Sequence, residues 1–188
     1  MKKFFSRVVL ALLFALQFGV AEAKINMFPE PRYIPPLNFY GDSGKAYKLT
    51  DFKEDLLMAM VWSKSCGPCL EDMRYLNSFA KKTADKGIKV ILISPEKEWR
   101  TIDERRNFLR KIGAPNLVSY LDKKATFRDG MGIMVTPTVI LVNKAGEEAG
   151  QITGAVRWDD EEVIEYMVKL KDDLLQELQE RKTANKKN

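Results

Sequence analysis

The only two cysteines of the chain, Cys66 and Cys69, are separated by Gly67 and Pro68. Two thiols at this spacing can form a structural disulfide, bind a soft metal ion, or cycle between dithiol and disulfide. A disulfide that closes so small a loop constrains the unfolded chain only slightly. A zinc site would need two further ligands, and the chain has no histidine and no other cysteine. Redox chemistry is therefore the main hypothesis, and Cu(I) held by two thiolates is the alternative.

Composition excludes several classes of function. The chain of 188 residues contains no histidine, so neither Ser-His-Asp nor Cys-His catalysis is available. Its formal net charge of +5 at pH 7 is too small to indicate a nucleic-acid partner, and the basic residues over 181–188 fit a solvated tail. The length suits one domain with a complete hydrophobic core.

Residues 1–23 have the pattern of a secretory signal peptide. Basic residues precede an apolar run from Val8 to Val20, and Ala21-Glu22-Ala23 fits a signal-peptidase site. The run is shorter than the roughly 20 apolar residues that span a bilayer. We therefore expect cleavage, no stable membrane insertion afterwards, and export to an oxidising space such as a periplasm. An uncleaved N-terminal membrane anchor is the alternative.

The residues around the dithiol predict a strand, a helix and a second strand. The apolar run LLMAMVW (56–62) is typical of a strand that is buried on both faces. Beyond Pro68, apolar residues recur at a helical spacing, and Gly87 is placed to end this helix. The run KVILIS (89–94) fits a second buried strand, parallel to the first.

This arrangement places Cys66 at the N-terminus of the helix. Unpaired N–H groups and the helix dipole stabilise an anion there, which lowers the pKa of a thiol. We expect Cys66 to be the nucleophile and Cys69, one turn further on, to be more buried and to resolve a mixed disulfide. Gly67 allows a tight bend, and Pro68 suits the first helical turn because a missing N–H costs nothing there.

Three segments flank this central unit. Residues 24–36 contain four prolines, which favour an extended arm over packed structure. A β-hairpin is expected over 37–49, where Gly41-Asp42-Ser43-Gly44 forms the turn. An insertion over 102–121 combines a helix, preceded by a capping-box signal, with a short strand.

The C-terminal part predicts a second hairpin over 138–153 and a long amphipathic helix over 159–180. All of these elements belong to one domain over 37–180. The predicted fold class is α/β, with a central mixed β-sheet flanked by helices.

Trp62, the CGPC sequence at 66–69 and the later Thr136-Pro137 pair resemble the thioredoxin superfamily. Within it, the chain is most similar over 36–170 to exported TlpA/ResA-like thiol-disulfide oxidoreductases, which share the hairpin before the CxxC strand and the central insertion. The resemblance implies a thioredoxin-like fold in which Pro137 is cis and lies against the dithiol. It also implies that backbone groups of Thr136 bind an extended substrate. We expect Trp62 to pack beneath the dithiol.

An acidic residue three positions after the second cysteine is common in that group, and Asp72 holds this position. Asp72 is a candidate for relaying a proton or tuning Cys69. The alternative is an idle acidic residue that only complements the helix dipole. Two positions differ from related chains. Met60 replaces the buried aspartate of thioredoxin, and Arg74 stands where many TlpA-like chains have proline.

The resemblance implies a reductase of protein disulfides that draws electrons from a membrane thiol donor of the DsbD or CcdA kind. Its clients would be apocytochrome c or copper-site proteins of cytochrome oxidase. Thioredoxin, which also has CGPC, has a reduction potential near about −270 mV, whereas the oxidant DsbA lies near about −120 mV. The redox-active pair Cys66–Cys69 would need no further cofactor and no metal. A disulfide oxidase or isomerase, a Cu(I) carrier that also uses Met131 or Met134, and an inactive interaction domain are the alternatives.

Overall fold

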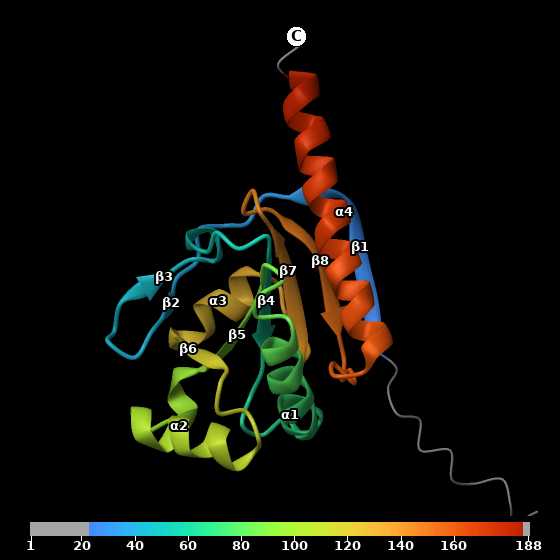
Figure 1. Ribbon diagram of the computed structural model, residues 1–188. Coiled ribbons are helices and arrows are strands. Elements are labelled where there is room, and N and C mark those ends of the chain that lie inside the picture. The colour runs from blue at the N-terminus through green and yellow to red at the C-terminus, as the bar shows by residue number, and fades with distance from the viewer. Residues whose placement is uncertain (1–22, 186–188) are drawn as a thin grey trace, which may run out of the picture.

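A computed structural model describes residues 23–185 (Figure 1). One mixed sheet of eight strands has the order β1-β8-β7-β4-β5-β6-β2-β3. The strands are β1 (Lys24–Arg32), β2 (Phe39–Tyr40), β3 (Ala46–Tyr47), β4 (Leu56–Val61), β5 (Ile88–Pro95), β6 (Val118–Asp122), β7 (Thr138–Asn143) and β8 (Glu148–Thr153). The helices are α1 (Gly67–Lys82), α2 (Ile102–Lys111), α3 (Thr126–Gly130) and α4 (Glu161–Asn185), with short 3-10 turns η2 (Leu49–Asp51), η3 (Glu96–Glu98) and η4 (Lys123–Ala125). The predicted α/β class with a mixed sheet flanked by helices is confirmed.

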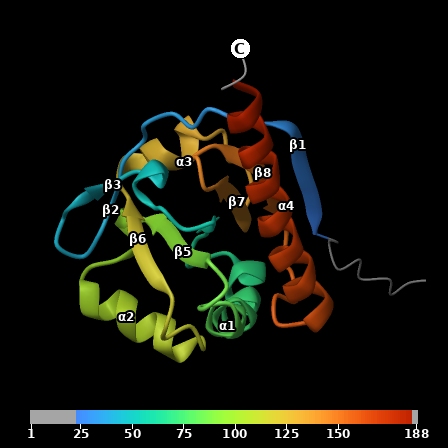
Figure 2. The ribbon, with the colours of Figure 1, turned by 45° about the horizontal axis from the view of Figure 1, so that its top comes forward.

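The apolar run expected to be a doubly buried strand is β4, in which every residue is buried. It pairs in parallel with β5 and antiparallel with β7. Alternate side chains of a strand point to opposite faces, so β4 contributes to two cores. Met58 and Met60 pack in the core that includes α1 and α4, while Leu57 and Ala59 pack in the core that includes Phe127 of α3. Figures 1 and 2 show α1 and α4 together on one side of the sheet.

Helix α1 begins where expected, but it ends at Lys82, well before Gly87. The hydroxyl of Thr83 donates to the Phe79 carbonyl oxygen at 2.9 Å, which satisfies a carbonyl at the helix end. Gly87 instead leads into β5 with φ +73°, and a Cβ there would lie 2.5 Å from Asp55 Oδ2. The glycine is required by this close approach and by its positive φ.

The N-terminal segment is extended, as expected, but its first nine residues are paired in the sheet and do not form a free arm. They form β1, which pairs antiparallel with β8 from Lys24 opposite Thr153 to Met27 opposite Gly150. The register then shifts before Arg32, and Pro29 and Pro31 lie in this irregular part. Proline is tolerated because β1 is an edge strand. Its outer side has no neighbouring strand in the described part of the chain, so a missing N–H there removes no hydrogen bond. The prolines indicated an unpaired arm, whereas the backbone on both sides of them pairs.

The C-terminal helix continues beyond the expected end. Because α4 runs to Asn185, Arg181 and Lys182 belong to the helix, and both remain exposed to solvent. The Arg181 Nη2 atom lies 2.7 Å from Glu147 Oε2, which fastens this end of the helix to the β7–β8 turn. Residues 186–188, and residues 1–22 of the predicted signal peptide, lie outside the described residues. Within 23–185 no helix is both long enough and apolar enough to cross a membrane.

The insertion adds α2 and β6 beside β5. Thr101 caps α2 as predicted, since its Oγ1 accepts a hydrogen bond from the Glu104 N–H at 3.0 Å. Strand β6 pairs in parallel with β5, and the hairpin joins the sheet where Tyr40 of β2 pairs with Leu121 of β6. The insertion and the hairpin therefore form the far end of the sheet, opposite β1 and β8.

Candidate active site

The dithiol lies at the junction between β4 and α1, in its disulfide form. Cys66 is the N-cap of α1, and its Sγ accepts a hydrogen bond from the Cys69 N–H at 3.2 Å. The Cα atoms of Cys66 and Cys69 are 5.3 Å apart across the disulfide. Cys66 is partly exposed and Cys69 is completely buried. Pro68 occupies the first turn as predicted, where its missing N–H leaves no bond unmade.

The strand register brings a distant loop to the same point. Val61 of β4 pairs with Thr138 of β7, so the residues just before Thr138 meet the residues just after Val61. The Thr136–Pro137 peptide bond is cis, and Pro137 is buried. The Thr136 carbonyl oxygen lies 3.5 Å from Cys66 Sγ. The structure thus brings together the CGPC and Thr-Pro sequences, which are about 70 residues apart.

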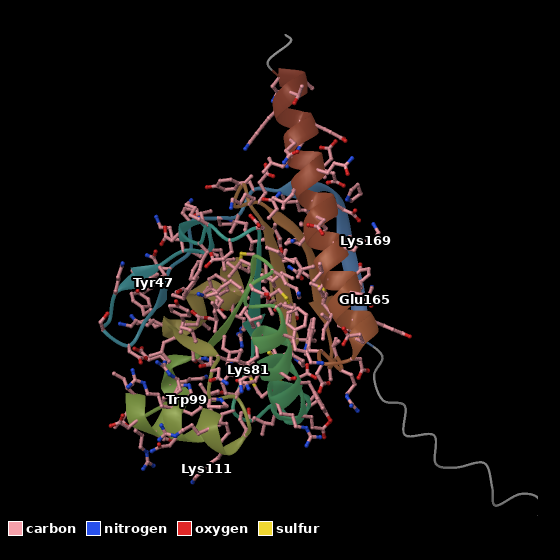
Figure 3. The ribbon with its side chains drawn as sticks, in the orientation of Figure 1. Tyr47, Lys81, Trp99, Lys111, Glu165 and Lys169 are labelled. Atoms are coloured by element: carbon pink, nitrogen blue, oxygen red, sulfur yellow. A yellow bond between two sulfur atoms is a disulfide. The ribbon has the colours of Figure 1, made fainter. Side chains whose placement is uncertain are left out.

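Trp62 is fully buried directly after β4 and supports this junction. Its ring centroid is 5.9 Å from that of Trp99 and 6.4 Å from that of Phe108 in α2. Figure 3 shows Trp99 beside α2. The aromatic cluster of Trp62, Trp99 and Phe108 connects the strand that precedes the dithiol to the insertion.

Asp72 is a buried carboxyl in α1, exposed by only 2%. It lies three residues after Cys69, so the two side chains share a face of the helix. Its Oδ1 accepts a hydrogen bond from the Val156 N–H at 2.9 Å, while Oδ2 is buried without a partner among residues 23–185. Burial raises the pKa of Asp72 from 3.8 to about 7, an effect that the Val156 hydrogen bond and the Trp158 side chain partly offset. The structure therefore places a buried carboxyl at this position and not a solvent-exposed one.

The profile of the Redoxin family matches residues 29–168. The chain belongs to the redoxin family. It is 27% identical over 127 residues to the thiol-disulfide oxidoreductase ResA of Bacillus thuringiensis, which covers 68% of this chain and 70% of that one. It is 30% identical over 105 residues to the thiol:disulfide interchange protein DsbE of Vibrio cholerae, covering 56% and 53%.

Solved structures of redoxin-like proteins have the same fold. A Chlorobium tepidum protein assigned as thiol:disulfide interchange protein DsbE aligns with a TM-score of 0.63 at 21% identity, over 76% of this chain and 97% of that one. StoA of Bacillus subtilis aligns with a TM-score of 0.54 at 18% identity, over 72% and 96%. The predicted thioredoxin-like fold and the ResA-like resemblance are confirmed, and this redoxin is a thiol-disulfide oxidoreductase.

Met60 and Arg74, the two positions that differ from related chains, lie in a core and on the surface respectively. Met60 is completely buried in the core of α1 and α4. Met60 carries no titratable group and cannot exchange a proton with the dithiol. Asp72 is a buried carboxyl that lies on the same helix face as Cys69. Arg74 is exposed, donates to the Tyr75 hydroxyl at 2.6 Å and covers the Tyr75 ring at 4.6 Å. Arg74 therefore belongs to the surface beside the site.

The part of the redoxin chain that the structure describes contains no group of three or more Cys, Asp or Glu side chains able to hold a metal ion. The two sulfur atoms of the dithiol are the soft ligands at this site. Met131 packs partly against the core of α3, whereas Met134 is 91% exposed. Met134 therefore packs in neither core of the described residues.

Sequence reasoning missed a carboxylate that holds the loop before Cys66. Glu98 of η3 accepts a hydrogen bond from the Ser63 hydroxyl at 2.5 Å through Oε1 and from the Lys64 N–H at 2.7 Å through Oε2. Lys64 in turn pairs with Glu104 of α2 at 2.7 Å. The carboxyl ends of parallel strands meet at one edge of a sheet, so an acid just after β5 could have been expected near the loop after β4.

Replacing Glu98 with glutamine is expected to lower the free energy of unfolding by about 1–3 kcal/mol, because an amide can accept only one of the two hydrogen bonds and has no charge. Urea unfolding of the oxidised protein measures the change. Glu96→Gln is the matched control, since the Glu96 side chain makes, among residues 23–185, only a long surface ion pair with Lys123 at 3.7 Å. Equal stability of the two variants would show that Glu98 does not hold the loop.

Proposed function

We propose that this redoxin is an exported reductase of protein disulfides in which Cys66 attacks and Cys69 resolves. The observation that carries the proposal is the unequal setting of the two sulfur atoms. Cys66 is partly exposed at the helix N-terminus, beside the Thr136 carbonyl, while Cys69 is completely buried. Only the first sulfur is accessible to a protein disulfide, and the N-terminal N–H groups of α1 stabilise it as a thiolate.

The reaction is a two-electron exchange. The Cys66 thiolate attacks one sulfur of the client disulfide, so that bond breaks and the other client sulfur leaves as a thiolate. A mixed disulfide joins Cys66 to the client. The Cys69 thiolate then attacks Cys66, the mixed disulfide breaks, and the client leaves with two reduced sulfurs. The protein now holds the Cys66–Cys69 disulfide and needs a dithiol donor to reduce it.

We assign to Asp72 the role of accepting the proton that the Cys69 thiol loses. A buried thiol must lose its proton to attack, and a carboxyl whose pKa is raised to about 7 can accept it at physiological pH. The two side chains share one helix face. Thioredoxin has an aspartate at the position that Met60 occupies here. Because methionine cannot accept a proton, Asp72 or water must accept the proton of Cys69.

Client binding is assigned to the loop that ends in Thr136 and Pro137. Met134 and Val135, just before it, are 91% and 55% exposed, which is unusual for large apolar side chains. The loop also lies beside Cys66 through the Thr136 carbonyl. An apolar rim and accessible backbone groups fit an extended segment of a protein client. Trp62, Gly67 and Pro68 shape the junction without contacting the client.

Export through the signal peptide at 1–23, a periplasmic location and a membrane donor of the DsbD or CcdA kind complete the proposal. Clients would be apocytochrome c or the copper-site proteins of cytochrome oxidase. No metal, additional cofactor or nucleic acid takes part in the cycle. An oxidase or isomerase on the same fold and a Cu(I) carrier at the reduced dithiol are the competing functions.

The reduction potential of the mature protein tests the direction of electron flow. Equilibration in graded dithiothreitol or glutathione buffers, followed by thiol alkylation, is expected to give about −230 mV or lower. A potential near about −120 mV would make the protein a disulfide donor. Stoichiometric Cu(I) binding by the reduced protein, without turnover of a disulfide substrate, would favour the carrier.

A further inference from the structure

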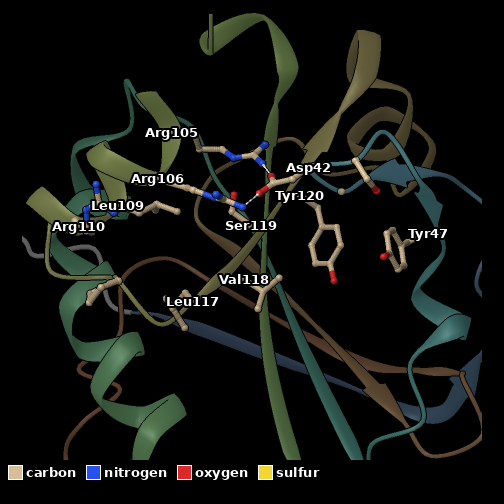
Figure 4. A pocket seen from close by; sticks show the side chains of 13 residues that line it. Asp42, Tyr47, Arg105, Arg106, Leu109, Arg110, Leu117, Val118, Ser119 and Tyr120 are labelled. Atoms are coloured by element: carbon tan, nitrogen blue, oxygen red, sulfur yellow. Dashed lines mark hydrogen bonds and ion pairs between the residues drawn. The ribbon is translucent and has the colours of Figure 1, made fainter. Parts of the chain in front are cut away.

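A pocket of about 530 Å³ lies between the β2–β3 hairpin, α2 and β6, away from the dithiol (Figure 4). None of the residues assigned to the redox site lines it. Four charged residues and two serines are among those that do, namely Asp42, Arg105, Arg106, Arg110, Ser43 and Ser119. The pocket therefore combines a concave shape with polar groups that could fix the orientation of a small polar ligand.

Arg105 is the unusual group in this pocket because its side chain is only 2% exposed. Its Nη2 donates to Asp42 Oδ1, but Nε and Nη1 are buried without a partner in the described part of the chain. The Ser119 hydroxyl is likewise buried and unpartnered there. Arginine stays protonated in proteins, so unmade hydrogen bonds of a buried guanidinium carry a large cost in free energy.

The charges in the pocket do not balance. Asp42 bridges two arginines, with Oδ2 lying 2.6 Å from Arg106 Nη2 and Oδ1 bonded to Arg105. Figure 4 shows both guanidinium groups directed at this carboxylate. Arg110 also lines the pocket, and the only hydrogen bond of its side chain within 23–185 is to Asn107. A structural ion pair that fastened the hairpin to α2 would need one arginine, whereas two guanidinium groups contact Asp42 and a third arginine lines the same pocket.

We propose that this pocket binds a doubly charged oxyanion, either free phosphate or the phosphate group of a small ester. Planar guanidinium groups match the oxygens of phosphate in pairs, and charge-assisted hydrogen bonds of this kind are the strong ones. Two negative charges would balance the excess of guanidinium groups over carboxylate.

Thermal unfolding and titration calorimetry of the oxidised protein test the site, with inorganic phosphate and glycerol 3-phosphate as probes and chloride at matched ionic strength as reference. Both phosphates are expected to stabilise the protein saturably. Tighter binding of the ester would identify a phosphate ester as the ligand class, and equal binding would identify free phosphate. The absence of saturable binding by either would overturn the proposal.

Variants separate this site from general charge effects. Arg106→Gln and Arg110→Gln, at exposed side chains, are each expected to weaken phosphate binding by about tenfold, since each removes a charged hydrogen-bond donor. Arg128→Gln, at an exposed arginine of α3, should leave binding unchanged. Equal affinity in all three variants would show that the pocket is not the site.

The Asp42→Asn variant is expected to change phosphate affinity in the opposite direction from the arginine variants. Removing the competing negative charge is expected to strengthen phosphate binding several-fold and to make the stabilisation by phosphate larger than in the unmodified protein. A structural ion pair alone predicts lower stability that phosphate does not restore, and that result would contradict the proposal. If this variant fails to fold, the two arginine variants decide the question.

Discussion

Serine in place of Cys69 is expected to leave the protein covalently joined to its clients through Cys66. The first exchange needs only the accessible sulfur, whereas release of the client needs the buried one. Mixed disulfides should accumulate on incubation with a disulfide-containing protein and should disappear on treatment with dithiothreitol. Non-reducing gel electrophoresis and mass spectrometry of the adduct measure the outcome, and reductase turnover should fall below detection.

Cys66→Ser is the matched control for this trap. It removes the exposed nucleophile and leaves the resolving thiol buried, so neither turnover nor adducts are expected. Adducts formed by Cys66→Ser and not by Cys69→Ser would reverse the assignment of the two roles. The serine side chain is close in size to cysteine, so circular dichroism should show the same fold for both variants.

Asparagine in place of Asp72 is expected to stabilise the oxidised protein at alkaline pH and to have little effect in acid. The folded-state pKa of about 7 lies above the ordinary value of 3.8. The native protein therefore binds a proton that the unfolded chain has lost between these values, and stability falls as pH rises through this window. A shift of about three pKa units corresponds to about 4 kcal/mol above pH 7. Asparagine keeps an oxygen that can accept from Val156 and never ionises.

Urea unfolding over a pH series measures this effect. The variant should exceed the unmodified protein by about 2–4 kcal/mol near about pH 8.5, and the difference should vanish near about pH 4. Glu71→Gln, at the exposed neighbour, should show no such pH dependence. A variant that is less stable at alkaline pH would mean that the carboxylate is stabilised in the fold. If Asp72 accepts the proton of Cys69, the pH profile of reductase turnover should have an inflection near about pH 7, and Asp72→Asn should lose it.

Local sequence pattern was sufficient to predict those elements whose structure depends on residues close together in the chain. The buried strand β4, the helix after CGPC and the cap at Thr101 follow from periodicity and from residue types that act over a few positions. The position of Pro137 against Cys66 could be predicted only through the resemblance, since a strand register far along the chain creates it.

The environment of Asp72 depends on segments distant in sequence. Its hydrogen-bond partner Val156 is 84 residues away, so the sequence could not decide between a buried acid and a solvated one. The same limit applies to Glu98, to the ion pair of Arg181 and to the pocket of three arginines. Each arises where the sheet order brings together loops that no local pattern connects. The α4 prediction ended too early because charged residues at its end pair with the β7–β8 turn.

The pairing of β1 with β8 has a consequence for the edge of the sheet. Without β1, strand β8 would present an open row of backbone N–H and carbonyl groups to any extended polypeptide. Residues 24–32 cover that row, and Pro29 and Pro31 offer no N–H groups to a further strand. This edge of the sheet is thereby expected to resist pairing with further strands. A chain shortened to begin at Tyr33 would be expected to expose β8 and to aggregate more readily as its own concentration rises.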